Sequence, residues 1–281
     1  MLQKNTVIKN LTDWAAENNQ VRAMILTSSR AKPGRQTDLF SDYDIELYVN
    51  DIRQFKNDNW LNDFGDVMIR WPLKPMATFD KAWITRLVLF ENEVRIDFQV
   101  TAKKSMHPSA YDDGYQVLVD KDKLTINLNT PTFSGYIIKK PEKEEYDNLV
   151  NAFFWDAPYV AKNLWRDELY YAKFMLDSSL RFSELQKMIE WHIAMQHNWS
   201  ISTGKRGRLF KHYLSAEVWK ELEATFSDAD TENNWRAFFK MIDLFRKLAK
   251  EVGDNLGYEY PEKIDEQVTA YCKKIKTTKK E

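Results

Sequence analysis

Three aspartates in the first hundred residues have the side chains and the spacing to do chemistry. Asp42 and Asp44 alternate with apolar residues, so on a strand their side chains lie on one face. Asp97 alternates in the same way in a later apolar stretch. Carboxylate oxygens are the ligands that Mg²⁺ prefers, and Mg²⁺ can bridge the attacking and leaving oxygens of a displacement at phosphorus. The pattern predicts a metal site, in which Asp97 is a third ligand or takes the proton from the nucleophile.

A turn of small polar residues precedes the paired aspartates. The residues Thr27-Ser28-Ser29-Arg30 follow an apolar run, and a polar loop then leads to Asp42. Small residues beside the end of a strand can admit a phosphate to the backbone. The turn, the Asp pair and Asp97 together indicate a magnesium-dependent site that acts on a nucleotide.

The Asp-x-Asp pattern alone is not specific, because it occurs three times in this chain. Asp120 and Asp122 lie in a stretch typical of a turn, whereas Asp228 and Asp230 lie at a predicted helix start, where acids favour the helix dipole. Considered alone, each strand also fits an ordinary half-exposed strand whose polar residues simply face solvent. Only the first pair combines a strand with an upstream turn and a further carboxylate downstream.

The elements that must position these residues follow from the hydrophobic periodicity. Apolar alternation predicts strands at 21–27, 42–49, 66–71, 83–90, 94–100 and 116–119. Pro72 and Pro75 are expected to close the third strand, and a hairpin turn to join the fourth and fifth.

The apolar period lengthens from 2 to about 3.6 from residue 141 onward. This periodicity predicts helical stripes at 146–153, 185–195 and 238–252 and shorter helices at 158–176, 215–225 and 262–275. With an amphipathic first helix at 6–18, the expected class is α+β. We predict a nucleotidyltransferase-type mixed sheet with flanking helices in residues 1–136 and an all-helical domain in residues 137–281.

Composition bounds the class of protein. The 281 residues are 43% apolar and 30% charged, as expected of a globular protein with a sizeable core. A total of 41 Lys and Arg against 42 Asp and Glu gives a formal net charge of −1, which argues against a general nucleic-acid binder. The single cysteine, Cys272, supports no internal disulfide framework.

The N-terminal stretch lacks the apolar core of a signal peptide, because Lys9, Asp13 and Glu17 interrupt it. No apolar run approaches the ~18 residues of a transmembrane helix. We therefore expect a cytoplasmic protein with no membrane or nucleic-acid partner, as a monomer or weak homodimer.

The residues singled out above resemble a known pattern. Ser29-Arg30, Asp42-Tyr43-Asp44-Ile45 and Arg95-Ile96-Asp97 are similar to the small turn, paired Asp and third carboxylate of the nucleotidyltransferase superfamily. More narrowly, the chain resembles the aminoglycoside 6-adenylyltransferase (streptomycin adenylyltransferase) family nearly end to end. The further matches are Phe40-Ser41, Trp60 to Phe64-Gly65, Leu118 to Asp122, Trp191-His192-Ile193-Ala194, Gly204-Lys205, Lys211, Tyr213-Leu214, Phe245-Arg246-Lys247 and Tyr260-Pro261.

The resemblance implies transfer of AMP from Mg²⁺-bound ATP to an aminoglycoside hydroxyl, with streptomycin at its 6-hydroxyl as the first candidate, release of pyrophosphate and inactivation of the antibiotic. It implies that Asp42 and Asp44 bind Mg²⁺, with Asp97 as third ligand or general base. The triphosphate contacts that it implies are Ser28, Ser29, Arg30 and Lys205.

The resemblance also implies that Glu168 holds the cationic acceptor or acts as base. Sequence does not choose among the acids of the helical half, which include Asp156, Asp167, Glu168, Asp177 and Glu190. The basic stretch 204–208 lacks the strand and first glycine of a P-loop, so it fits either a solvated loop or a triphosphate clamp.

One residue departs from the family pattern. Ser28 occupies a position where the family has glycine, which tolerates a positive φ and lets a phosphate approach the backbone. Two alternative functions therefore stay open: an adenylyltransferase with a different acceptor, and a nucleotide-binding homologue without turnover that acts through a partner. His192 and His197 are five residues apart, which fits a core histidine better than a zinc site.

Overall fold

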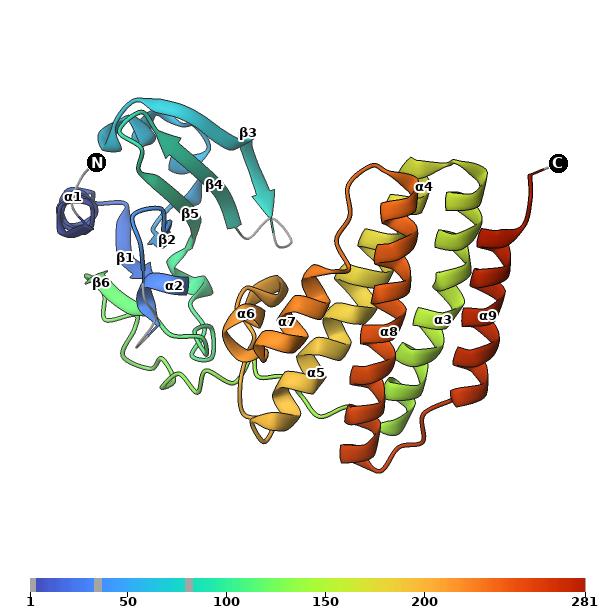
Figure 1. Ribbon diagram of the computed structural model, residues 1–281. Helices are drawn as coiled ribbons and strands as arrows, with labels where there is room; N and C mark the ends of the chain where they lie inside the picture. Colours follow the sequence, from blue (N-terminus) through green and yellow to red (C-terminus); the bar gives the residue numbers. More distant parts are fainter. Residues whose placement is uncertain (1–3, 33–36, 79–82, 281) are drawn as a thin grey trace. The chain divides into compact units, whose positions relative to one another are not determined.

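A computed structural model describes residues 4–32, 37–78 and 83–280. The chain forms two compact units, residues 1–135 and 136–281. The first contains the β-sheet and the second is helical (Figure 1). This confirms the predicted α+β class. In the described part of the chain, no helix has the length and apolar character needed to cross a membrane.

The sheet of the first unit has six strands in the order β3-β4-β5-β2-β1-β6. Their bounds are β1 Val21–Leu26, β2 Tyr43–Val49, β3 Val67–Thr78, β4 Trp83–Phe90, β5 Arg95–Ala102 and β6 Gln116–Asp120. β2 and β5 pair in parallel and the other neighbours are antiparallel, so the sheet is mixed, as predicted. The parallel pair β2–β5 brings the sequence-distant aspartates onto neighbouring strands.

The larger core cluster of the first unit lies on one face of this sheet, and a smaller cluster lies on the other. Ile45 and Leu47 of β2 and Phe98 of β5 point into the larger cluster, and α1 (Lys4–Glu17) adds Leu11. Trp60, in the 3₁₀ turn η2 (Asn59–Phe64), packs edge-on against Phe98. A second 3₁₀ turn, η1, spans Ile52–Phe55. Because side chains alternate along a strand, the residues between these core positions face the other way.

The third strand was predicted to close at Pro72, and that prediction is wrong. β3 continues through both Pro72 and Pro75 to Thr78, with a cis Trp71–Pro72 peptide and an interrupted register between Trp71 and Met76. β3 is an edge strand that pairs with β4 alone. A proline there, which has no backbone N–H, therefore removes no hydrogen bond to a second neighbouring strand. The two prolines therefore mark an edge strand and not the end of a strand.

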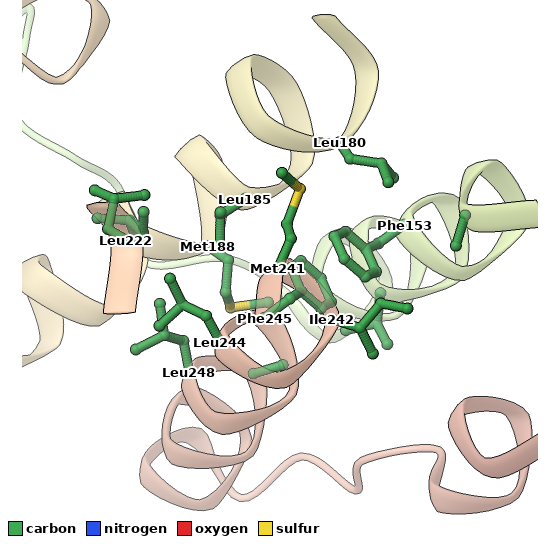
Figure 2. Packing of buried hydrophobic residues seen from close by; sticks show 14 of the residues in the cluster. Phe153, Leu180, Leu185, Met188, Leu222, Met241, Ile242, Leu244, Phe245 and Leu248 are labelled. Atoms are coloured by element: carbon green, nitrogen blue, oxygen red, sulfur yellow. The ribbon is translucent and has the colours of Figure 1, made fainter. Parts of the chain in front are cut away.

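The second unit is a bundle of helices. Its elements are α3 Lys143–Arg166, α4 Leu169–Phe174, η4 Met175–Leu185, α5 Gln186–Gln196, α6 Phe210–Tyr213, α7 Ala216–Glu223, α8 Thr231–Leu256 and α9 Glu262–Thr277. Figure 2 shows its core, where Phe153 of α3 stacks on Phe245 of α8 with ring centroids 3.7 Å apart. His192 is buried in this unit, as its spacing suggested.

A separate helix over 158–176 was predicted, and this is also wrong. α3 is continuous from Lys143 through Pro158 to Arg166, and it ends at Asp167 with a left-handed φ of 65°. Burial of Ala157, Val160 and Leu164 holds the helix together across the proline. The following segment, η4, is a π-helix, which periodicity does not reveal.

Candidate functional site

Asp44 and Asp97 lie directly opposite one another in the parallel β2–β5 register. Tyr43 and Ile45 point into the core, which leaves Asp44 on the other face of the strand. Asp42 directly precedes β2, and its charge acts on Asp44. The structure therefore brings together the three aspartates that the sequence nominated.

Arg95 contributes positive charge to this cluster, and the sequence argument gave it no role there. It makes two 2.9 Å hydrogen bonds to the Asp97 carboxylate, and its Nε lies 3.6 Å from Asp42 Oδ2. The signal was present, since residues two apart on a strand share a face. Arg95 offsets part of the negative charge that three close carboxylates would otherwise carry.

The carboxylate charges are not fully compensated. Burial, then the charges of Asp97 and Asp42, raise the pKa of Asp44 to about 6. Burial also raises the pKa of Asp42, and the Arg95 guanidinium opposes that rise. A site with excess negative charge and hard oxygen donors has the chemistry that Mg²⁺ requires.

The donor types fit a magnesium ion, whereas the side-chain arrangement is not a formed ion site. Within residues 4–32, 37–78 and 83–280, no group of three or more His, Cys, Asp or Glu side chains is arranged to hold a metal ion. Asp97 is instead engaged by Arg95. A cation bound by all three carboxylates would compete with the Arg95 guanidinium for the Asp97 oxygens.

The predicted small-residue turn lies beside the aspartates. It forms the short helix α2 (Ser28–Ala31) directly after β1, and the Thr27 amide donates to the Asp44 carbonyl. The Ser28 hydroxyl lowers the pKa of the Asp44 side chain against the effect of burial. Ser28 has a φ of 57°, the left-handed conformation for which glycine is suited.

Arg30 holds the loop that leads to Asp42. Its Nε donates to the Asp42 carbonyl at 2.9 Å and a terminal nitrogen donates to the Ser41 carbonyl. Its guanidinium also lies 3.8 Å from the centroid of the Tyr43 ring. Arg30 therefore fixes the entry to β2, in addition to any contact with a nucleotide.

The left-handed backbone at Ser28 gives a stability prediction. Ser28→Ala and Ser28→Gly both lose the hydroxyl that acts on Asp44, but only alanine keeps a Cβ at positive φ. We expect Ser28→Ala to be the less stable variant by about 1 kcal/mol. Urea denaturation of both variants measures the difference. Equal stabilities would show that the strain at Ser28 is negligible.

A buried polar network continues along the same face of β2. The Tyr111 hydroxyl donates to the Glu46 carboxylate, and the Tyr48 and Tyr111 oxygens lie 2.6 Å apart. Burial raises the pKa of Glu46, and the two tyrosine hydrogen bonds oppose that rise. Tyr111 comes from the loop between β5 and β6, and no spacing in the sequence links it to Glu46.

Removing one hydroxyl from this network tests how firmly it holds β2. Tyr111→Phe is expected to lower the free energy of unfolding by about 1–3 kcal/mol, because the partly buried Glu46 carboxylate has one hydrogen bond fewer. Urea denaturation measures the loss. Tyr115→Phe is the control, since Tyr115 contributes a ring contact to Tyr111. Equal effects of the two substitutions would contradict the role of the hydroxyl.

Two residues nominated by sequence belong to the second unit. Lys205 begins the 3₁₀ turn η5 (Lys205–Gly207) and its side chain is exposed. Glu168 precedes α4, is exposed and lies 4.0 Å from the Arg166 guanidinium. Both side chains are therefore accessible within their own unit.

The chain is similar to known proteins over nearly its whole length. The model of a family described as streptomycin adenylyltransferase matches residues 1–275. An aminoglycoside 6-adenylyltransferase of Bacillus subtilis (strain 168) is 35% identical over 94% of each chain, and one of Campylobacter jejuni is 29% identical over 96% of this chain and 95% of its own. A crystal structure of an aminoglycoside 6-adenyltransferase from Bacillus subtilis is 26% identical, covers 99% of this chain and 100% of its own, and has a TM-score of 0.49.

Proposed function

Because the chain belongs to the streptomycin adenylyltransferase family, we propose that this nucleotidyltransferase transfers AMP from ATP to a hydroxyl of an aminoglycoside and releases pyrophosphate. The first candidate acceptor is streptomycin at its 6-hydroxyl, and the consequence is inactivation of the antibiotic. The observation that carries the proposal is the cluster of Asp42, Asp44 and Asp97 beside the turn at Ser28.

The cluster has residues for each requirement of the reaction. Asp42 and Asp44, with Asp97 as third ligand or general base, would hold Mg²⁺, which neutralises phosphate charge when bound. As a base, Asp97 would accept the proton of the acceptor hydroxyl. Ser28, Ser29 and Arg30 are the proposed contacts of the triphosphate.

We propose domain bounds of 1–136 and 137–281. The second domain is proposed to supply the remaining contacts with the phosphate and the acceptor. Lys205 is the proposed phosphate contact from the helical domain, because an exposed ammonium can bind a phosphate as a point charge. Glu168 is proposed to hold a cationic group of the acceptor or to act as the base. Each role depends on the family pattern and is testable by substitution.

Incubation of the full chain with labelled ATP, Mg²⁺ and a panel of aminoglycosides tests the function. Label on streptomycin and formation of pyrophosphate are the expected results. Label on another acceptor would support the adenylyltransferase activity and contradict the substrate. Binding of ATP without transfer to any acceptor would overturn the proposal in favour of a nucleotide-binding protein that acts through a partner.

A further inference from the structure

Glu46 is a further carboxylate on the face of β2 that carries Asp44. It comes two residues after Asp44, and side chains two apart on a strand point to the same side, about 7 Å apart along the strand. Ile45 and Leu47, its neighbours in sequence, are buried in the larger core cluster on the other face. Glu46 therefore borders the proposed metal cluster without being one of its proposed ligands.

Two tyrosine hydroxyls hold one oxygen of this carboxylate and leave the other open. Tyr111 donates to Oε2, and the Tyr48 hydroxyl lies 3.3 Å from the same oxygen. In the described part of the chain Oε1 has no hydrogen-bond partner, and it is not an enclosed atom, so solvent reaches it. Glu46 as a whole is partly exposed. The side chain is thus fixed in place with one free acceptor oxygen.

The charge of Glu46 is not balanced by a cation. The two hydroxyls are neutral donors, and the residue opposite Glu46 on β5 is Gln99, a neutral amide. Burial raises the pKa of Glu46, and the negative charge of Asp44 adds to that rise. Within residues 4–32, 37–78 and 83–280, no Lys, Arg or His forms an ion pair with Glu46. A cation is therefore the partner that the free oxygen lacks.

Glu46 and the turn at Ser28 lie on opposite sides of Asp44 along β2. β1 runs antiparallel to β2 with Ile25 beside Glu46, and the Thr27 amide, at the start of the turn, donates to the Asp44 carbonyl. In a displacement at phosphorus the attacking and leaving oxygens lie roughly in line, on opposite sides of the phosphorus atom. With the triphosphate at the turn and pyrophosphate leaving in that direction, the acceptor approaches from the side of Glu46.

From this geometry we propose that Glu46 binds an ammonium or guanidinium group of the acceptor through Oε1, beside the hydroxyl that receives AMP. The assignment rests on the proposed function, because that function supplies a cationic acceptor and the direction of its approach. An N–H cation would donate a charge-assisted hydrogen bond to Oε1 and balance the carboxylate charge. Because the tyrosines already hold the side chain, little of its rotamer freedom is lost on binding. Glu46 is then a specificity-determining residue, since a neutral acceptor would leave its charge unpaired.

Rates of AMP transfer by the full chain at varied streptomycin, with ATP and Mg²⁺ saturating, test this role. Glu46→Gln keeps the length of the side chain and an oxygen for the tyrosine hydroxyls, but it removes the charge. We expect its KM for streptomycin to rise at least about tenfold, because a charge-assisted hydrogen bond is lost. The KM for ATP and the Mg²⁺ concentration at half-maximal rate should stay within about twofold of the wild type. Glu91→Gln, at an exposed position in the turn between β4 and β5, is the matched control and should keep all three values.

The other possible results each contradict the assignment. An unchanged KM for streptomycin would show that Glu46 does not contact the acceptor, and a raised Mg²⁺ requirement would assign Glu46 to the metal instead. A rise in both KM values together with a lower midpoint temperature of thermal unfolding would show a structural role. Failure of the proposed function is distinct, because then the wild type itself would label no aminoglycoside.

Discussion

Asp44→Asn is expected to reduce AMP transfer at least about a thousandfold while the protein stays folded. The substitution keeps the shape of the side chain but removes its negative charge, and burial is the largest cause of the raised pKa of Asp44. Its pKa of about 6 leaves it mainly ionised at pH 7.5, where it can bind a cation. Transfer of label from ATP at saturating Mg²⁺ measures the loss.

The same variant has a predictable effect on stability. The folded pKa of Asp44, about 6, lies above its ordinary value of 3.8, so the folded state binds this proton more tightly than the unfolded chain. The resulting stabilisation is complete below pH 3.8 and is lost as the pH rises through about 6. Asp44→Asn should therefore gain stability relative to the wild type between pH 5 and pH 7.5.

Midpoint temperatures of both proteins at pH 5 and pH 7.5 provide the control for folding. An inactive variant that is as stable as the wild type at pH 7.5, or more stable, supports a chemical role for Asp44. Turnover near that of the wild type would show that Asp44 is not needed for the metal. Loss of the folded state at both pH values would contradict the stability argument.

The strands that carry the site could be predicted because each buries one face. Alternation located the strand of Asp42 and Asp44, and the fourth strand matches 83–90 at both ends. The parallel pairing of β2 with β5 is not a local property, so sequence could only suggest that Asp97 would join the pair. The turn and the aspartates indicated a nucleotide site, and the family resemblance added what these residues alone do not give, which is the aminoglycoside acceptor.

The remaining features depend on tertiary contacts. The path of β3 through Pro72 depends on its edge position, and the continuity of α3 across Pro158 depends on buried neighbours. The contact of Tyr111 with Glu46 joins residues 65 apart. No period or motif in the sequence marks such a contact.

Asp97→Asn has the second largest expected effect, a loss of at least about a hundredfold in transfer rate. In the folded chain Arg95 divides its guanidinium between Asp97 and Asp42, at 2.9 and 3.6 Å. Without the charge at position 97, Arg95 would neutralise Asp42 more strongly. The affinity of the cluster for a cation would therefore fall by more than the loss of one carboxylate alone explains.

This competition separates the two roles proposed for Asp97. If Asp97 is a metal ligand, Asp97→Asn should raise the Mg²⁺ concentration that gives the half-maximal rate. A second substitution, Arg95→Gln, should then reverse part of that rise, because it frees the Asp42 carboxylate. If Asp97 acts as a general base only, its loss should leave the Mg²⁺ requirement unchanged and lower the rate equally at every Mg²⁺ concentration. Asp66→Asn, at an exposed position before β3, is the matched control and should match the wild type in both measurements. Because the carboxylate of Asp97 faces that of Asp44 across the β2–β5 register, we expect the metal-ligand result, and an unchanged Mg²⁺ requirement would contradict it.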